Sequence, residues 1–319
     1  MQSSYPIQRI VPIDALRGLI MILMALDHVR DFFHIQAMTS QANDLSQASP
    51  ELFFTRWITH FCAPAFMLTA GAAAFFKLNR TQNKSQLSRY LWTRGLWLIF
   101  LELIVLRFAM FFSLTSGPVM LTVLYGLGGS MILLGLLIHM PFRALCLLTF
   151  CSIILNSLFT LLPAAALGQL AWIWNLIYQP GLFMVGPVPV FVAYPVLPWA
   201  ALMTAGFCLG SIYSLPTEKR MKILFRLGAG CLIAFLIIRG INLFGDPVPW
   251  TTEFTGKTLL SFLNTTKYPP SLCFILMTTG PVFLFLAWLD QKKLSSTHPL
   301  MVFGQTPLFY FLSHFFFIH

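Results

Sequence analysis

Apolar runs of about twenty residues, separated by short polar or basic segments, recur along almost the whole chain. A helix of about twenty apolar residues matches the thickness of a bilayer's hydrocarbon core. Charged residues make up only 9% of the 319 residues, whereas a soluble domain is usually about 25% charged. Too few charged side chains are therefore present to cover a water-facing surface. The pattern excludes a soluble globular domain and predicts an all-α, polytopic membrane helical bundle.

We expect a single transmembrane domain over residues 1–319 with about nine transmembrane helices. A backbone inside lipid must satisfy its own hydrogen bonds, so each long apolar run is expected to be helical. The aromatic segment 164–189 is expected to lie at the outer surface or to re-enter the membrane there, because Trp and Tyr concentrate at that depth. The expected spans are 13–35, 52–76, 90–112, 118–140, 143–163, 190–213, 222–244, 270–289 and 299–319.

Basic residues occupy alternate loops between these spans. The loops on one side hold Lys77, Arg80, Lys84, Arg89, Arg143, Lys219, Arg220, Lys222, Arg226, Lys292 and Lys293. The opposite loops hold only Lys257 and Lys267. The positive-inside rule then predicts a cytoplasmic N-terminus, with loops 36–51, 163–189 and 245–269 facing outward. The net charge of +10 is explained by these loop clusters, so no nucleic-acid partner is expected.

Ionisable residues interrupt several of the apolar spans. A charge at the bilayer centre costs about 2.5–3.5 kcal/mol, so each needs a partner, a wet cavity or a function. With a helical rise of about 1.5 Å per residue, the ionisable residues in the outer portions of five spans lie at one depth. This predicts a shared polar pocket near the outer leaflet. The residues are Asp14, Arg17, Asp27, His28, Arg30, Asp31, His34, Arg56, His60, Arg94, Glu102, Arg107, Arg239 and His314.

Helical phase refines this expectation for the first two spans. His28 and Asp31 share a face of span one, so the carboxylate can meet the imidazole one turn on. Arg56 and His60 are four residues apart and share a face of span two. Structural explanations stay open beside the functional ones. Asp14 and Arg17 could be an ion pair at the helix entry, Arg30, Asp31 and His34 an interfacial helix end, and Arg56 a structural partner of Glu102.

The candidate chemistry is acid–base catalysis at a buried histidine. His28 lies beside Asp27 and Asp31, and a carboxylate can orient an imidazole and stabilise its charged form. No Gly-x-Ser-x-Gly elbow, phosphate-binding loop or Cys/His metal pattern is present, so no metal is expected. The six cysteines lie in apolar runs without disulfide spacing. The arginines favour an anionic ligand, although two histidines on different helices could also ligate haem.

Several motifs resemble a known family of membrane enzymes. Asp14-Ala15-Leu16-Arg17-Gly18 followed by Asp27-His28 is similar to the first helix of integral-membrane acyltransferases. Further segments, spread over nearly the whole chain, resemble bacterial relatives of heparan-α-glucosaminide N-acetyltransferase. These segments are Thr59-His60-Phe61-Cys62-Ala63-Pro64 with Gly71, Tyr194-Pro195-Val196-Leu197-Pro198-Trp199, Gly245-Asp246-Pro247 with Pro249-Trp250, Asn264 to Ser271, and Gly304 to Tyr310 with His314.

The resemblance implies transfer of an acetyl or other acyl group across a bacterial inner membrane. Acyl-CoA would enter from the cytoplasm, and a sugar amine, glycan hydroxyl or other envelope acceptor would wait outside. The family's catalytic histidine is matched most closely by His34 rather than His28, so His28, His34 and His60 all stay candidates, with Asp27 and Asp31 beside them. Family members usually continue through another one or two helices, which leaves open whether His319 is the natural end; an oligomer is also compatible.

Positions on the predicted helices assign roles to the remaining residues. Arg17 and Arg94 lie in inner portions and are expected to attract the phosphates of acyl-CoA. The residues expected to hold the acceptor are Arg30, Arg56, Glu102, Arg107, Arg239, Lys267 and His314. Two other functions stay open. Buried carboxylates and histidines also serve a proton-coupled transporter, although the chain shows no clear internal repeat, and a haem-binding electron carrier is the third.

Overall fold

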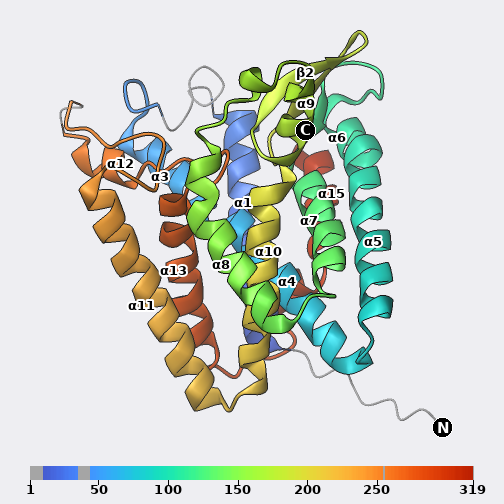
Figure 1. Cartoon of the computed structure of the whole chain (residues 1–319), viewed down its shortest axis with the longest axis vertical. Coiled ribbons are helices and arrows are strands. Elements are labelled where there is room, and N and C mark those ends of the chain that lie inside the picture. The colour runs from blue at the N-terminus through green and yellow to red at the C-terminus, as the bar shows by residue number, and fades with distance from the viewer. Residues whose placement is uncertain (1–9, 35–43, 254–255, 319) are drawn as a thin grey trace.

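The protein is a bundle of long helices with a small sheet at one end (Figure 1). The computed structural model describes residues 10–34, 44–253 and 256–318. The long helices are α1 (Val11–Phe33), α4 (Cys62–Thr81), α5 (Lys84–Leu101), α7 (Val123–Leu137), α8 (Phe142–Phe159), α10 (Val196–Gly210), α11 (Thr217–Ile241), α13 (Leu272–Leu289) and α15 (Pro307–Ile318). Each predicted span overlaps one of these helices, so the helical character of the long apolar runs is confirmed.

Shorter helices extend or connect the long ones. α3 (Pro50–Thr59) leads into α4 through His60 and Phe61, and α14 (Pro299–Gln305) leads into α15 through Thr306. α14 and α15 meet at 93°, because Pro307 lacks the N–H that would continue the hydrogen-bond ladder. The remaining short helices are η1 (Glu102–Leu106), α6 (Arg107–Phe111), η2 (Ala164–Leu170), α9 (Ala171–Ile177), η3 (Ser211–Ser214) and α12 (Thr258–Leu263).

Three short strands correct the all-α prediction. β1 (Val119–Leu121) pairs in parallel with β3 (Val188–Val192), and β3 pairs antiparallel with β2 (Gly181–Val185). Gly186 has a φ of 58° and makes the tight turn between β2 and β3. η2, α9, β2 and the start of β3 make up segment 164–189, which the aromatic pattern assigned to the outer surface or to a re-entrant segment. The sheet lies at the end of the bundle that also carries α12 and the start of α3 (Figure 1).

Five helices among the described residues are long and apolar enough to cross a bilayer, and the bent α14–α15 pair adds a sixth if it counts as one span. The five are 50–81, 142–159, 196–214, 217–241 and 272–289. α1 is not among them because its charged residues lie toward both ends, so every stretch of 18 residues in it holds more than two of Asp14, Arg17, Asp27, Arg30 and Asp31. The molecule therefore has the helices of an integral membrane protein, while nine crossings stay a prediction.

Glycines allow two pairs of helices to touch backbone to backbone. A Cβ added at Gly71 of α4 would lie 1.8 Å from the Met203 carbonyl oxygen of α10. A Cβ at Gly304 of α14 would lie 1.8 Å from the Asp14 carbonyl oxygen of α1, and one at Gly18 would lie 1.9 Å from that of Leu300. Such small-residue contacts are the usual means of close helix packing in membranes. Gly71 therefore allows α4 and α10 to pack closely.

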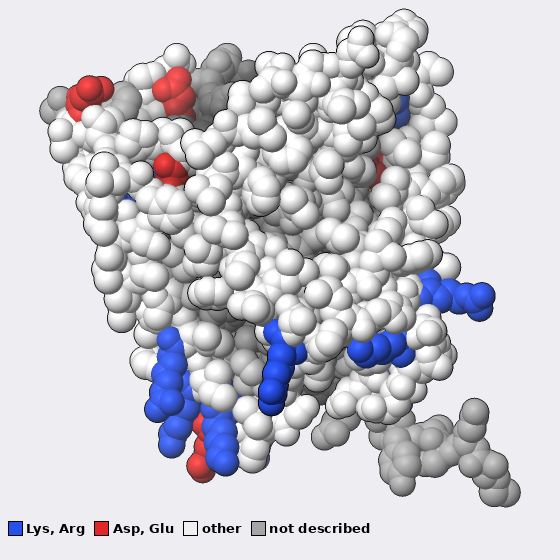
Figure 2. Space-filling view, in the orientation of Figure 1, with Lys and Arg blue, Asp and Glu red and all other residues white. Residues whose placement is uncertain are grey.

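Charge is distributed unevenly along the bundle axis. Lys and Arg side chains gather at the end where α11 begins, and Asp and Glu side chains are more frequent at the opposite end (Figure 2). Between the two ends, the visible face is covered by uncharged side chains (Figure 2). We call the end where α11 begins the basic end and the opposite end the sheet end. The two polar sites described below lie between the helices, one nearer each end.

Candidate functional sites

Asp27 is the centre of a polar cluster on the sheet-end half of α1. Its Oδ1 atom accepts a hydrogen bond from Nη2 of Arg30 at 2.6 Å and one from the Thr59 hydroxyl at 2.8 Å. Arg56 of α3 adds an ion pair at 3.5 Å. Arg30 also binds Asp31 at 2.6 Å. These contacts join α1 to α3 and bring together four of the residues that the sequence assigned to one pocket.

The two carboxylates do not hydrogen-bond to His28 among the described residues, contrary to the predicted contact between His28 and Asp31. Asp27 and Asp31 converge on Arg30 instead, and the Asp31 side chain remains 50% exposed. A guanidinium offers a charge-assisted fork of donors that an imidazole lacks, so it is the stronger partner for a carboxylate. The histidine is therefore oriented by another group.

That group is His314 of α15. Nδ1 of His28 and Nε2 of His314 lie within hydrogen-bond distance, and Nδ1 of His314 lies 3.1 Å from the Tyr310 carbonyl oxygen. Phe311 and Phe315 contact the His28 ring from the same helix, with ring centroids 6.4 and 4.4 Å away. The fold thus joins the first and last described long helices through these two rings.

His60 and Lys267 complete the buried part of the cluster. Both are less than a tenth exposed, and Lys267 and Arg56 interact electrostatically with the His60 ring. The Lys267 ammonium lies 5.1 Å from the centre of the Tyr268 ring, and the Tyr268 hydroxyl lies 3.4 Å from that of Tyr194. Nδ1 of His60 and Nη1 of Arg30 are buried without a hydrogen-bond partner among the described residues. These unpaired donors or acceptors suit a polar ligand.

Arg239 holds the loop that carries Lys267. Its guanidinium donates to the carbonyl oxygens of Ser261, Phe262, Asn264 and Val248 at 2.8–3.1 Å, and it lies 3.8 Å from the Asp246 carboxylate. Asp246 in turn accepts hydrogen bonds from Thr266 and Ser271. The guanidinium is 2% exposed and its donors are occupied, so Arg239 positions the loop.

Glu102 and Arg107 lie away from the polar cluster and also bind backbone. Glu102 accepts hydrogen bonds from the Thr122 amide and hydroxyl and from the amides of Leu124 and Tyr125. A carboxylate at the N-terminus of α7 satisfies amides that have no partner inside the helix. The alternative of a Glu102–Arg56 pair is wrong, because Arg56 pairs with Asp27. Arg107 donates to the Ser116 and Gly117 carbonyls.

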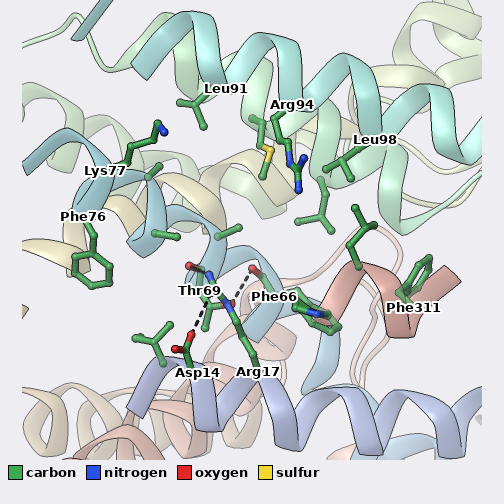
Figure 3. A pocket seen from close by; sticks show the side chains of 18 of the residues that line it. Asp14, Arg17, Phe66, Thr69, Phe76, Lys77, Leu91, Arg94, Leu98 and Phe311 are labelled. Carbon is green, nitrogen blue, oxygen red and sulfur yellow. Dashed lines mark hydrogen bonds and ion pairs between the residues drawn. The ribbon is translucent and has the colours of Figure 1, made fainter. Parts of the chain in front are cut away.

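A cavity of about 510 Å³ opens nearer the basic end. Four basic side chains line it, Arg17, Lys77, Arg80 and Arg94, against the single carboxylate of Asp14. Arg17 extends from α1 and Arg94 from α5, so the two face each other across the space (Figure 3). Arg17 donates to the Thr69 carbonyl at 2.7 Å and pairs with Asp14 at 3.6 Å. The entry ion pair expected between Asp14 and Arg17 is present, and it forms part of this cavity.

Apolar side chains line the rest of the cavity, and Phe311 connects it to the polar cluster. The apolar lining includes Met21, Leu91, Leu98, Leu124, Leu127 and Met131. Phe311 lines the cavity and also contacts the His28 ring edge to face. The basic cavity and the histidine pair are therefore separated at this point by a single aromatic side chain.

Both sites contain residues that the sequence did not indicate. Lys77 and Arg80 line the cavity, although their positions in the chain indicated only loop charges. Thr59 contributes its hydroxyl and Tyr310 its backbone carbonyl, and no charge pattern reveals such contacts. His34 is exposed at the end of α1. No group of three metal-ligating side chains occurs within the described ranges.

The apolar helices and the polar sites enclosed between them define an integral membrane protein. Residues 9–242 match the family model described as heparan-alpha-glucosaminide N-acetyltransferase, catalytic, and the chain belongs to that family. A search of curated proteins found no match. The family indicates a membrane acetyltransferase-type function. The match includes His28, the Asp27 cluster and the basic cavity except for its α15 residues, whereas Lys267 and His314 lie beyond it.

Proposed function

We propose that this protein transfers an acyl group, acetyl in the first instance, from acyl-CoA in the basic cavity to an acceptor at the polar cluster. The contact of Phe311 with both the cavity and His28 is the observation that carries the proposal. It gives a thioester in the cavity a short route to the histidine pair. The acceptor group is an amine or a hydroxyl of a sugar or of another envelope molecule.

The cavity has the two properties that acyl-CoA requires. Arg17, Lys77, Arg80 and Arg94 supply the charge-assisted hydrogen bonds that phosphates favour. The apolar wall from α5 and α7 suits the less polar arm that ends in the thioester. The loops predicted at the opposite end hold only Lys257 and Lys267, which supports entry of the donor from the basic end.

His28 is the general base in this proposal. Its imidazole takes a proton from the acceptor's N–H or O–H group while that atom bonds to the acyl carbon. The C–S bond then breaks, and the thiolate of CoA takes the proton back from the imidazolium. Asp27 holds Arg30 and Arg56 beside the reaction centre, and Arg30, Arg56 and Lys267 contact the acceptor.

The test is transfer of labelled acetyl from acetyl-CoA to glucosamine by the purified protein in lipid nanodiscs. His28→Gln should reduce kcat by at least about 100-fold, the usual contribution of a general base. His139→Gln is the matched control, because His139 is exposed beyond the end of α7. Full activity of the His28 variant overturns the assignment of the base. Uptake of glucosamine into proteoliposomes without acetyl-CoA would favour a transporter instead.

A further inference from the structure

His314 has a hydrogen-bonding pattern that determines the protonation of His28. A backbone carbonyl oxygen can only accept, so Nδ1 of His314 must donate to the Tyr310 carbonyl, 3.1 Å away. A neutral imidazole carries one N–H, which leaves Nε2 of His314 as an acceptor. The nearest donor to that atom is Nδ1 of His28.

The two rings are arranged for such a bond. Their planes differ by only 15° and their centroids are 4.7 Å apart. With the two nitrogens in direct contact, this separation corresponds to rings that lie edge to edge in nearly one plane. The N–H of one ring then points along the lone pair of the other, as a hydrogen bond requires.

The geometry points to His314 as a positioning residue: with the Tyr310 carbonyl, it holds neutral His28 in the tautomer whose Nε2 atom is unprotonated. Among the described residues, the hydrogen bond of the His28 ring is made by Nδ1 and none is made by Nε2. Its lone pair is therefore free to accept the acceptor's proton. The catalytic significance of this tautomer rests on the proposed function, whereas the tautomer itself does not.

This arrangement fills the position that a carboxylate holds in other catalytic histidine sites. There, an aspartate accepts from Nδ1–H and fixes the imidazole with Nε2 toward the substrate. Here both nearby carboxylates are bound to Arg30, and a neutral histidine accepts instead. Packing of Phe315 against both rings, with centroids 4.4 and 4.5 Å away, restricts their rotation.

The test reads the tautomer directly, without any substrate. Solid-state NMR of the full protein in lipid, with ¹⁵N-labelled histidine, distinguishes protonated from unprotonated ring nitrogens. The signals of His28 are identified as those absent from His28→Gln. At mildly alkaline pH, wild-type His28 should show a protonated Nδ1 and an unprotonated Nε2. A protonated Nε2 in the wild-type protein overturns the inference, whatever the activity.

Variants of His314 then test its effect on catalysis. His314→Leu removes the acceptor and should allow both His28 tautomers, with a fall in kcat of about 10–100-fold, as for other groups that orient a functional histidine. The KM for acetyl-CoA should be unchanged. His314→Gln offers an amide oxygen to Nδ1–H of His28 and should restore the tautomer and most of the activity.

Ser313→Ala is the control on the same helix, because the Ser313 hydroxyl also donates to the Tyr310 carbonyl and its loss should leave the tautomer unchanged. If His314→Leu keeps both the single tautomer and full kcat, His314 does not position His28. If the wild-type tautomer is as stated but the wild-type protein transfers no acetyl, the tautomer assignment holds and the proposed function fails.

Discussion

At the scale of single residues, burial determines how much an aspartate ion pair contributes to stability. Asp27 is 14% exposed and binds Arg30, Arg56 and Thr59, whereas Asp31 is 50% exposed and forms an ion pair with Arg30. Buried pairs are costly to break, because the remaining charge loses its partner without regaining water. Exposed pairs contribute at most about 1 kcal/mol.

We therefore expect Asp27→Asn to lower the free energy of unfolding by about 3 kcal/mol, because two guanidinium groups lose their shared counter-charge. Asp31→Asn is the matched control and should change it by less than about 1 kcal/mol. Denaturation of the purified protein in mixed micelles measures both. Equal stability of the two variants would show that the Asp27 cluster is hydrated in the protein.

A second prediction concerns the cavity. Arg94→Ala should raise the KM for acetyl-CoA about tenfold, the loss of one charge-assisted hydrogen bond, while kcat changes little. Arg143→Ala removes an exposed arginine that is not part of the cavity lining and should leave the KM unchanged. The measurement is initial rate against acetyl-CoA concentration. An unchanged KM in Arg94→Ala would place the phosphates elsewhere.

At the scale of helices, the contact between α1 and α14 depends on two glycines. Gly304→Ala should destabilise the protein by about 3 kcal/mol, the upper part of the usual range for overpacking, because the added methyl group would overlap the Asp14 carbonyl. Gly230→Ala in α11 is the control, since nothing lies within 4 Å of its added Cβ. There the substitution should be neutral or slightly stabilising, because Ala favours helix. Thermal unfolding distinguishes the two.

The sequence was sufficient to predict the helices, but not to predict which groups their polar side chains would bind. Long apolar runs predicted all the long helices, because lipid leaves the backbone few alternatives. Depth along each span predicted His28 and His314 at one level, and the two rings meet. Depth does not predict which side chains face each other, and these two residues are 286 positions apart in the sequence. Glu102 and Arg239 bind backbone atoms, and backbone partners leave no signal in a sequence.

The segment between α8 and α10 shows a different limit. Its aromatic composition indicated a position near the membrane surface. That composition is equally compatible with a re-entrant segment and with a segment that lies on the outer surface. β2 pairs with β3 through a two-residue turn, and β3 pairs with β1, which precedes α7 in the chain. The second pairing joins residues 71 positions apart, such as Val119 and Val190. Contacts of that separation depend on the packing of the whole bundle.

At the scale of the molecule, the uneven charge predicts the orientation in the membrane. Basic side chains gather at one end (Figure 2), and the positive-inside rule assigns that end to the cytoplasm. In that predicted orientation, the basic cavity would face the cytoplasm, where the proposed donor acyl-CoA is present, and the polar cluster would face the other side. Orientation therefore decides whether donor and acceptor can come from opposite sides.

Labelling of single cysteines in intact cells tests this orientation. Met184→Cys, in the exposed part of β2, should react with a membrane-impermeant maleimide added from outside. Lys84→Cys, at the start of α5, should react only after the membrane is opened, because the positive-inside rule places it in the cytoplasm. The wild-type protein controls for its six native cysteines. The reverse pattern would put the basic cavity outside the cell, where acyl-CoA could not reach it, and the proposed direction of transfer would be wrong.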